Sequence, residues 1–355
     1  LISFIASMSG EGNLRVEENL GEGYVRLRVS EAERRQAKHD IQHVEDIVIE
    51  MLRNARDAGA DKVYLATTKE EGVRTLLFLD NGSGVPQDMQ ERIFDARVTS
   101  KLESMKMDRW GVHGRGMALF SIKQNTDEAR VVTSGVDLGS SFKVRVATER
   151  LGERADQSSW PQAVKDEDGR YVCARGPHNI IRAACEFALE ELRCCDVYLG
   201  SPSEIAATLY AQASSRLDTS RLLFIDDECE LPVIDRLGLA SDAEDFIRIC
   251  SGLGLEMSER TAHRILSGQI KPVRGVTARL LRERDSTSHA PAPIDLAKDR
   301  RGLRIAKDDM AQFSRAVERD FNDLAARYYL NLCGDPKIRV SRDRITVTFD
   351  LAKEE

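Results

Sequence analysis

An acidic residue, an amide and a second acidic residue recur at helical spacing in the stretch EMLRNARDAGA, residues 50–60. At about 100° per residue, Glu50, Asn54 and Asp57 share one side of a helix. Carboxylates and an amide gathered on one side of a helix can take part in acid–base chemistry or bind a metal ion. A solvated helix face is the alternative for these three residues, because exposed faces also carry polar groups.

A second polar stretch, FLDNGSGV, follows an apolar run that predicts a strand. Asp80 ends this strand, and Gly82 and Gly84 come directly after it. Asp-Asn-Gly is an ordinary turn signal. In the alternative interpretation, the Asp80 carboxylate accepts a hydrogen bond from the exocyclic amino group of a purine, and the glycines let the backbone approach the flat base.

A third stretch, GVHGRGMALFSI, places Gly111, Gly114 and Gly116 just before an apolar helical pattern. A loop of this kind leaves backbone N–H groups at a helix N-terminus, where they suit phosphate oxygens. No Gly-Lys-Ser/Thr occurs here, which excludes a P-loop, and the spacing does not fit the strand, turn and helix of a dinucleotide-binding fold.

The elements that must position these residues alternate between helix and strand. A helix is predicted from Glu31 to Ala58, broken once and ending at Gly59, and a second from Met117 to Lys123. Residues 81–116 have little periodicity and predict a long loop. Strands are predicted at 24–29, 62–67, 74–80, 129–134 and 141–147. Helices with mostly antiparallel strands make a two-layer α+β sandwich, which we expect for residues 20–150.

The order of these pieces resembles the Bergerat ATP-binding fold of the GHKL superfamily, which includes gyrase B subunits, heat-shock chaperones, histidine kinases and MutL. The resemblance covers residues 20–150. EMLRNARDAGA, DNGSGV and VTSK are most similar to MutL and its relatives, whereas GVHGRGMAL is nearer the glycine pattern of type IIB topoisomerase B subunits.

The resemblance implies magnesium-dependent binding of ATP and its slow hydrolysis, coupled to lid closure and to a conformational or self-association switch. It implies that Glu50 is the general base, that Asn54 is the ligand of Mg²⁺ and that Asp57 lies near the nucleotide. Asp80 would bind adenine, joined through water by Thr133. The further nucleotide contacts that it implies are Gly82, Gly84, Lys101, Gly111, Gly114, Arg115 and Gly116.

Residues 85–112 are predicted to form the lid over the nucleotide. They contain few large apolar side chains and the charged run SKLESMKMDRW, so we expect them to be mobile until a bound triphosphate supplies contacts. Trp110 lies at the edge of this segment, and Trp160 is the only other tryptophan in the sequence.

The rest of the chain predicts three further parts: a small α/β region at 170–235, a helical region at 238–285 and a C-terminal helix with a β-hairpin at 300–355. Residues 260–284 hold seven Lys or Arg and one acidic residue, after a glycine between two helical patterns that is typical of helix-turn-helix units. Residues 298–307 add five Lys or Arg against one Asp. DNA is therefore a candidate partner of both segments, and a solvated charged face is the alternative.

Two other functions remain open beside a switch driven by ATP hydrolysis. One is a nucleotide-responsive DNA-binding regulator in which hydrolysis is incidental. The other, phosphotransfer of the histidine-kinase type, is disfavoured because His39 and His43 are too close to the motif to lie on a separate dimerisation hairpin. Outside residues 20–150, Lys271 is a candidate for a lysine that contacts the γ-phosphate, and an ordinary surface role is the alternative.

Bulk composition limits the remaining classes. The 355 residues suffice for two or three domains, and a net charge of −7 excludes a surface coated all over with basic groups. No apolar run approaches the roughly 20 residues that span a bilayer, so no membrane partner is expected. Seven cysteines, an odd number without a CxxC pair, predict reduced thiols in a cytoplasm and no structural metal site.

Overall fold

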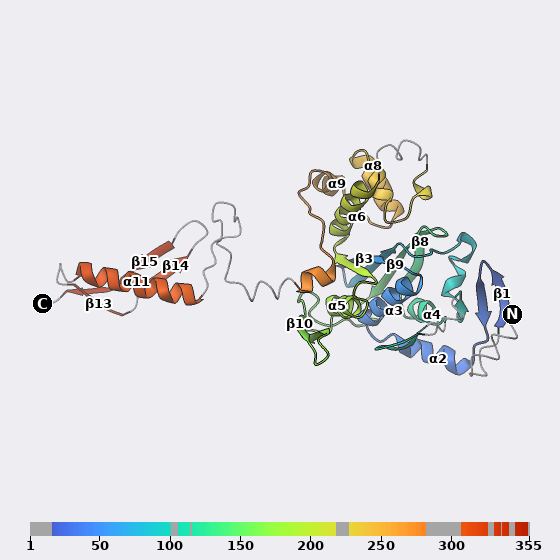
Figure 1. Cartoon of the computed structure of the whole chain (residues 1–355), viewed down its shortest axis with the longest axis horizontal. Helices are drawn as coiled ribbons and strands as arrows, with labels where there is room; N and C mark the ends of the chain where they lie inside the picture. Colours follow the sequence, from blue (N-terminus) through green and yellow to red (C-terminus); the bar gives the residue numbers. More distant parts are fainter. Residues whose placement is uncertain are drawn as a thin grey trace. The chain divides into compact units, whose positions relative to one another are not determined.

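The computed structural model is divided into two compact units, residues 1–285 and 286–355 (Figure 1). It describes residues 16–100, 106–113, 116–217, 227–281, 307–325, 330–334, 336–340 and 345–353. Within these ranges, no helix combines the length and the apolar character that crossing a membrane requires.

A five-stranded sheet is the centre of the first unit. Its strands, in spatial order, are β12 (Asp196–Gly200), β3 (Lys62–Glu70), β4 (Val73–Asp80), β9 (Ser140–Ala147) and β8 (Glu128–Ser134). The strands from β3 to β8 are antiparallel, while β12 pairs parallel to β3. Glu71 and Gly72 connect β3 to β4 with φ angles of 48° and 79°, the left-handed conformation that a two-residue hairpin turn of type I′ requires.

Helices from the first 200 residues cover one face of this sheet. They are α3 (Val44–Asp57), α4 (Ala118–Asn125) and α5 (Ile180–Glu190), and α2 (Glu31–Asp40) packs against α4. The predicted break in the first helix is confirmed, and a capping box between Ser30 and Glu33 starts α2. Val44, Ile47 and Leu52 of α3 are fully buried against Val63, Leu65, Leu76 and Phe78 of the sheet. The predicted α+β sandwich is therefore confirmed for this part of the chain.

Later residues cover the other face and add a third layer. These elements are α6 (Pro202–Arg216), the short 3-10 helices η3 (Glu228–Glu230) and η4 (Arg236–Leu239), α8 (Ala243–Gly252) and α9 (Glu259–Leu266). Tyr64, Leu77 and Leu79 of the sheet are buried in the same cluster as residues of α6, α8 and α9. The helices and β12 from the predicted 170–235 and 238–285 regions thus belong to the same compact unit as the first 150 residues.

The segment between β4 and α4 contains more structure than a loop. It holds η1 (Gln87–Met89), η2 (Arg92–Phe94), β5 (Val98–Thr99), β6 (Lys106–Asp108) and β7 (Gly111–His113). Strand β5 joins β1 (Val16–Gly21) and β2 (Tyr24–Leu27) in a small sheet. Its buried apolar residues are Val85, Met89, Ile93, Phe94 and Val98. Their irregular spacing hid them from a periodicity argument, so residues 85–99 are anchored in the core more firmly than the sequence predicted.

Each unit contains a further antiparallel hairpin. In the first unit it is formed by β10 (Gln162–Lys165) and β11 (Tyr171–Arg175). In the second unit, α11 (Lys307–Ala325) precedes β13 (Leu330–Leu332), which pairs antiparallel with β16 (Leu351–Lys353). The predicted closing hairpin is confirmed as β14 (Lys337–Val340) and β15 (Ile345–Thr348).

Candidate functional site

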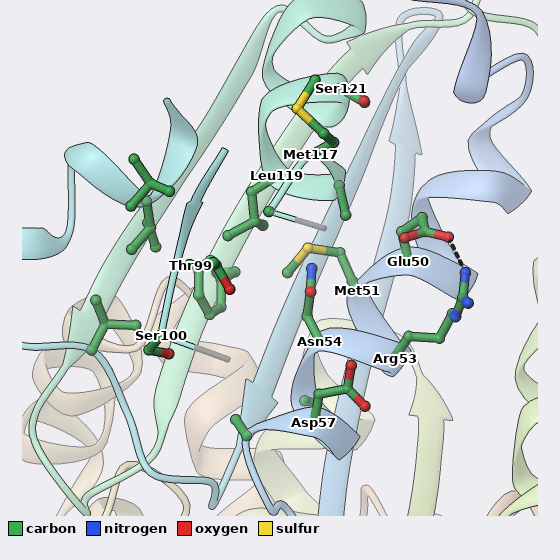
Figure 2. Close-up of a pocket in the computed structure, with 18 of the residues that line it drawn as sticks. Glu50, Met51, Arg53, Asn54, Asp57, Thr99, Ser100, Met117, Leu119 and Ser121 are labelled. Carbon is green, nitrogen blue, oxygen red and sulfur yellow. Dashed lines mark hydrogen bonds and ion pairs between the residues drawn. The ribbon is translucent and has the colours of Figure 1, made fainter. Parts of the chain in front are cut away.

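A cavity of about 470 Å³ lies between α3, α4, the β5 segment and the end of β4. Figure 2 shows α3 side chains on one side of it and Thr99, Ser100, Leu119 and Ser121 on the other. Its polar lining residues are Glu33, Gln36, Asp40, Glu50, Arg53, Asn54, Asp57, Asp80, Ser83, Arg97, Thr99, Ser100, Ser121 and Ser140. Phe78, Val85 and Phe142 supply an apolar floor.

Helix α3 brings the first three predicted residues to this cavity. Glu50, Asn54 and Asp57 follow one another at i, i+4 and i+7 and all line it. The Glu50 side chain is 21% exposed and that of Asp57 only 1%. These side chains therefore do not form the solvated stripe that was the alternative interpretation of the sequence. Buried carboxylates need charged or hydrogen-bonding partners, and a cationic ligand or basic side chains can supply them.

Asp80 lies at the carboxyl end of β4, 4% exposed, and also lines the cavity. Its Oδ1 accepts a hydrogen bond of 2.8 Å from the backbone N–H of Gly82. Close packing accounts for both glycines of this turn. A Cβ on Gly82 would come within 2.9 Å of the Ala58 carbonyl oxygen, and one on Gly84, where φ is +68°, would come within 1.8 Å of that of Gly135. Gly84 lines the cavity, whereas Gly82 is absent from its lining.

The glycine turn before α4 borders the cavity at Gly116. Gly116 has a φ of +67°, and its carbonyl oxygen accepts a hydrogen bond of 2.8 Å from the backbone N–H of Arg97. Met117 caps α4 without a side-chain hydrogen bond, so the first turn of this helix offers its N–H groups at the cavity edge. Gly111 belongs to β7. The predicted contacts Lys101, Gly114 and Arg115 lie outside the described residues.

Thr133 is not brought to the cavity. Its Oγ1 accepts a hydrogen bond of 2.9 Å from Nη1 of Arg236, a buried residue of η4 on the other face of the sheet. The paired Ser141 faces the same way and donates to the carbonyl oxygen of Leu253. A register shift between Val131 and Thr133 places the residues of β8 in a way that simple alternation does not predict. Ser140 is instead the cavity-lining hydroxyl from this part of the sheet.

Two arginines of α3 form a buried ion-pair network that the sequence did not indicate. Arg53 contacts Glu50 at 2.6 Å and Asp108 of β6 at 3.0 Å. Arg56 contacts Asp57 at 2.9 Å, Asp108 at 3.1 Å and Glu191 at 3.0 Å. Because Asp108 lies more than fifty positions from both arginines, no local spacing rule could have found this pairing.

The network favours the charged forms of Asp108 and Arg56. Burial alone would raise the pKa of Asp108, but the hydrogen bond from Arg56 and the charge of Arg53 outweigh burial and lower that pKa. Burial likewise opposes the charge of Arg56, and its hydrogen bonds to Asp57 and Glu191 outweigh burial and raise its pKa. The ion pairs of Asp108 therefore persist to a lower pH than those of an unperturbed aspartate, and they are lost as the pH falls through the lowered pKa of Asp108.

Arg97 is a further cavity residue that sequence reasoning missed. It is 6% exposed, has a φ of 63° and pairs with Glu33 of α2. The backbone N–H of Ser30 and, despite some burial, the Arg97 guanidinium lower the pKa of Glu33. A left-handed conformation at a buried arginine leaves no signal in the sequence, because glycine and asparagine are the residues that normally mark it.

Comparisons with known proteins give matches for the part of the chain that contains most of the cavity lining. Residues 41–156 match the family described as histidine kinase-, DNA gyrase B-, and HSP90-like ATPase. The DNA mismatch repair protein MutL of Pediococcus pentosaceus is 31% identical over 115 residues, 32% of this chain and 17% of the relative. The MutL of Staphylococcus aureus (strain Newman) is 34% identical over 136 residues, 36% of this chain and 20% of the relative. The chain thus covers about a fifth or less of the length of these relatives.

Proposed function

We propose that this chain binds ATP and hydrolyses it slowly, because residues 41–156 match the family of histidine kinase-, DNA gyrase B- and HSP90-like ATPases and are similar to MutL proteins. The observation that carries the proposal is the single cavity that joins the polar face of α3, the end of β4 and the start of α4. ATP occupancy would drive lid closure and, through it, a change of conformation or self-association.

The lining of the cavity suits both the base and the phosphates of ATP. Asp80 is a buried acceptor in that lining and would receive the exocyclic amino group of adenine. Gly116 and the uncapped first turn of α4 present backbone N–H groups, which would bind phosphate oxygens. Glu50 would position the attacking water molecule, because its carboxylate lies one turn before Asn54 on the same helix face.

The donor atoms of α3 fit magnesium. Mg²⁺ prefers oxygen ligands and usually binds through one or two protein groups together with substrate phosphates and water. Asn54 lines the cavity on the same helix as Glu50 and Asp57, and its amide oxygen would be such a ligand. No group of three or more His, Cys, Asp or Glu able to hold a metal ion occurs among the described residues, which agrees with an ion held largely by the nucleotide. Bound magnesium would neutralise phosphate charge during hydrolysis.

The direct test measures phosphate release from ATP by the purified chain, with magnesium and with excess chelator. Slow release that requires magnesium is expected, and release no faster than from a buffer blank would reject the proposal. Adding DNA separates the alternatives: an ATP-driven switch should hydrolyse ATP with or without it, whereas a regulator should change its DNA affinity on ATP binding alone. If a label on the γ-phosphate of ATP remains attached to the protein, the chain instead carries out phosphotransfer of the histidine-kinase type.

Lid closure gives a second prediction, for the described parts of residues 95–112. Their amide hydrogen exchange should slow when a non-hydrolysable ATP analogue is bound, because the triphosphate adds contacts beside Gly116. Trp110 lines the cavity and stacks on Phe187, so its fluorescence should change as well. Peptides from α6, on the other face of the sheet, are the internal control. Equal exchange at 95–112 with and without saturating analogue would exclude a nucleotide lid.

DNA contact is a second candidate function, carried by the exposed face of α9. Helices α8 and α9 pack through Phe246, Ile249, Ala262 and Ile265, and the connection between them turns at Gly254, where φ is +84°. This packing leaves the side chains of Arg260, His263 and Arg264 exposed together. The guanidinium of Arg279 instead lies over the Trp160 ring, 3.9 Å from its centroid. Lys271 is exposed and is not part of the cavity lining. Residues 298–306 lie outside the described residues.

The α9 hypothesis predicts salt-dependent binding of duplex DNA. Arg260→Ala together with Arg264→Ala should weaken binding by about tenfold at low salt and make the dependence on salt shallower, since fewer counterions are released. Arg175→Ala, which removes an exposed arginine from β11, is the matched control and should bind like wild type. Equal affinity of the double variant and the control in a fluorescence anisotropy titration would assign α9 a solvated role.

A further inference from the structure

Arg53 joins the α3 face to the β6–β7 hairpin at one buried point. Its side chain is 3% exposed, and its Nη1 lies 2.6 Å from Oε1 of Glu50. Its Nε and Nη2 donate to the two carboxylate oxygens of Asp108, each at 3.0 Å. Figure 2 shows the Arg53 side chain turned towards Glu50 along the helix.

This geometry restricts the Glu50 carboxylate. A free glutamate side chain populates several rotamers, and only some of them can hold a water molecule in one place. A guanidinium is planar and presents its donors in a rigid fork, so an arginine that is held at one side by a bidentate carboxylate has little freedom at the other. Asp108 therefore orients Arg53, and Arg53 in turn holds Glu50.

We propose that Arg53 is a positioning residue for ATP hydrolysis and that Asp108 acts through it. The proposal rests on the proposed function and adds to it a route by which the segment before the glycine turn reaches the site of hydrolysis. Asp108 ends β6, and β7 leads along the chain to Gly116 at the cavity. A shift of this hairpin would move Asp108, and the Arg53 fork would carry that movement to Glu50.

The alternative is that the network only fastens the hairpin to α3. Arg56 provides the means to separate the two roles, because it contacts Asp108 and Glu191 while Glu50 is held by Arg53. Glu191→Gln removes a carboxylate from the same network without touching the Arg53–Glu50 pair. A fastening role predicts similar effects of Glu191 and Arg53 substitutions, through stability. A positioning role predicts that only the Arg53 substitution lowers kcat.

The experiment compares kcat, the KM for ATP and the melting temperature of four variants with those of wild type. Arg53→Leu should lower kcat by about tenfold or more with KM within about twofold, the pattern of a lost interaction in the transition state. Asp108→Asn should lower kcat by a smaller factor. The double variant should be no slower than Arg53→Leu alone, since residues that act through one another are non-additive. Glu191→Gln should keep the wild-type kcat.

Arg53→Lys keeps the charge and serves if Arg53→Leu does not fold. A lysine can reach one carboxylate but cannot form the fork, so its kcat should still fall severalfold at a melting temperature near that of wild type. A wild-type or higher kcat in the folded Arg53 variants, or a loss that falls on KM, would overturn the proposal. Hydrolysis lost in Glu50→Ala but kept in both Arg53 variants would reject only this inference, whereas a wild-type chain without ATPase activity would reject the proposed function itself.

Discussion

Glu50→Ala is expected to lower the rate of ATP hydrolysis by about a hundredfold or more while ATP affinity stays within about twofold of wild type. In the proposed function the carboxylate would position water and would not contact adenine, so binding and hydrolysis should separate. Glu50 lines the cavity one turn from Asn54 and is only partly exposed, which makes an ordinary surface pair a poor account of it. Single-turnover hydrolysis and calorimetry with a non-hydrolysable analogue measure the two quantities.

The fold of this variant should persist, because Arg53 keeps both hydrogen bonds to Asp108 when Glu50 is removed. Glu50→Gln is the shape-matched companion: it retains the side-chain length but cannot take up a proton from water as a carboxylate does. Asn54→Ala should differ from both by weakening the magnesium-dependent part of ATP binding. Turnover at the wild-type rate in Glu50→Ala would exclude Glu50 as the general base.

Asp80→Asn is expected to weaken ATP binding by about 1–3 kcal/mol, the range for a buried polar group left without its proper partner. Oδ1 of Asp80 accepts from the Gly82 N–H, and the oxygen of an asparagine can continue to do so. The NH₂ group of the amide would then replace the second oxygen and point a donor where the adenine amino group also donates. The variant should therefore fold normally and bind ATP poorly.

Calorimetric titration with the non-hydrolysable analogue measures this loss directly. Asp137→Asn is the matched control, since Asp137 is exposed, does not line the cavity and has a φ of 60° that asparagine tolerates. Its affinity should equal that of wild type. Unchanged affinity in Asp80→Asn as well would leave Asp80 as a turn residue and move the adenine site elsewhere.

Local patterns account for the part of the site that the sequence predicted. Glu50, Asn54 and Asp57 follow from the helical period alone, and Asp80 from its place at the end of an apolar strand. The residues that sequence reasoning missed or misplaced depend on structure at a distance. Asp108 reaches Arg53 across a hairpin, and Thr133 is directed away from the cavity by a register shift inside β8.

In the fold, too, local features could be predicted from the sequence and contacts between distant residues could not. Antiparallel neighbours such as β3 and β4 are joined by a tight turn, so their pairing is visible in the sequence. Strand β12 is short and pairs parallel with β3, from which most of the sheet and its helices separate it. Nothing in the five residues of β12 identifies β3 as its partner strand. The third layer, formed by α6, α8 and α9, likewise depends on contacts between residues far apart in the sequence.

The pairing of β12 with β3 has a consequence for the order of events during synthesis. Until β12 has left the ribosome, β3 is an edge strand whose outer N–H and C=O groups have no partner in the sheet. The cavity-lining residues of α3 and β4 emerge long before that point, yet β3 of the same sheet remains an edge strand. A nascent chain ending near residue 156 would therefore expose both this edge and the sheet face that α6 and α8 later cover. We expect such a chain to engage chaperones until residues 196–266 arrive.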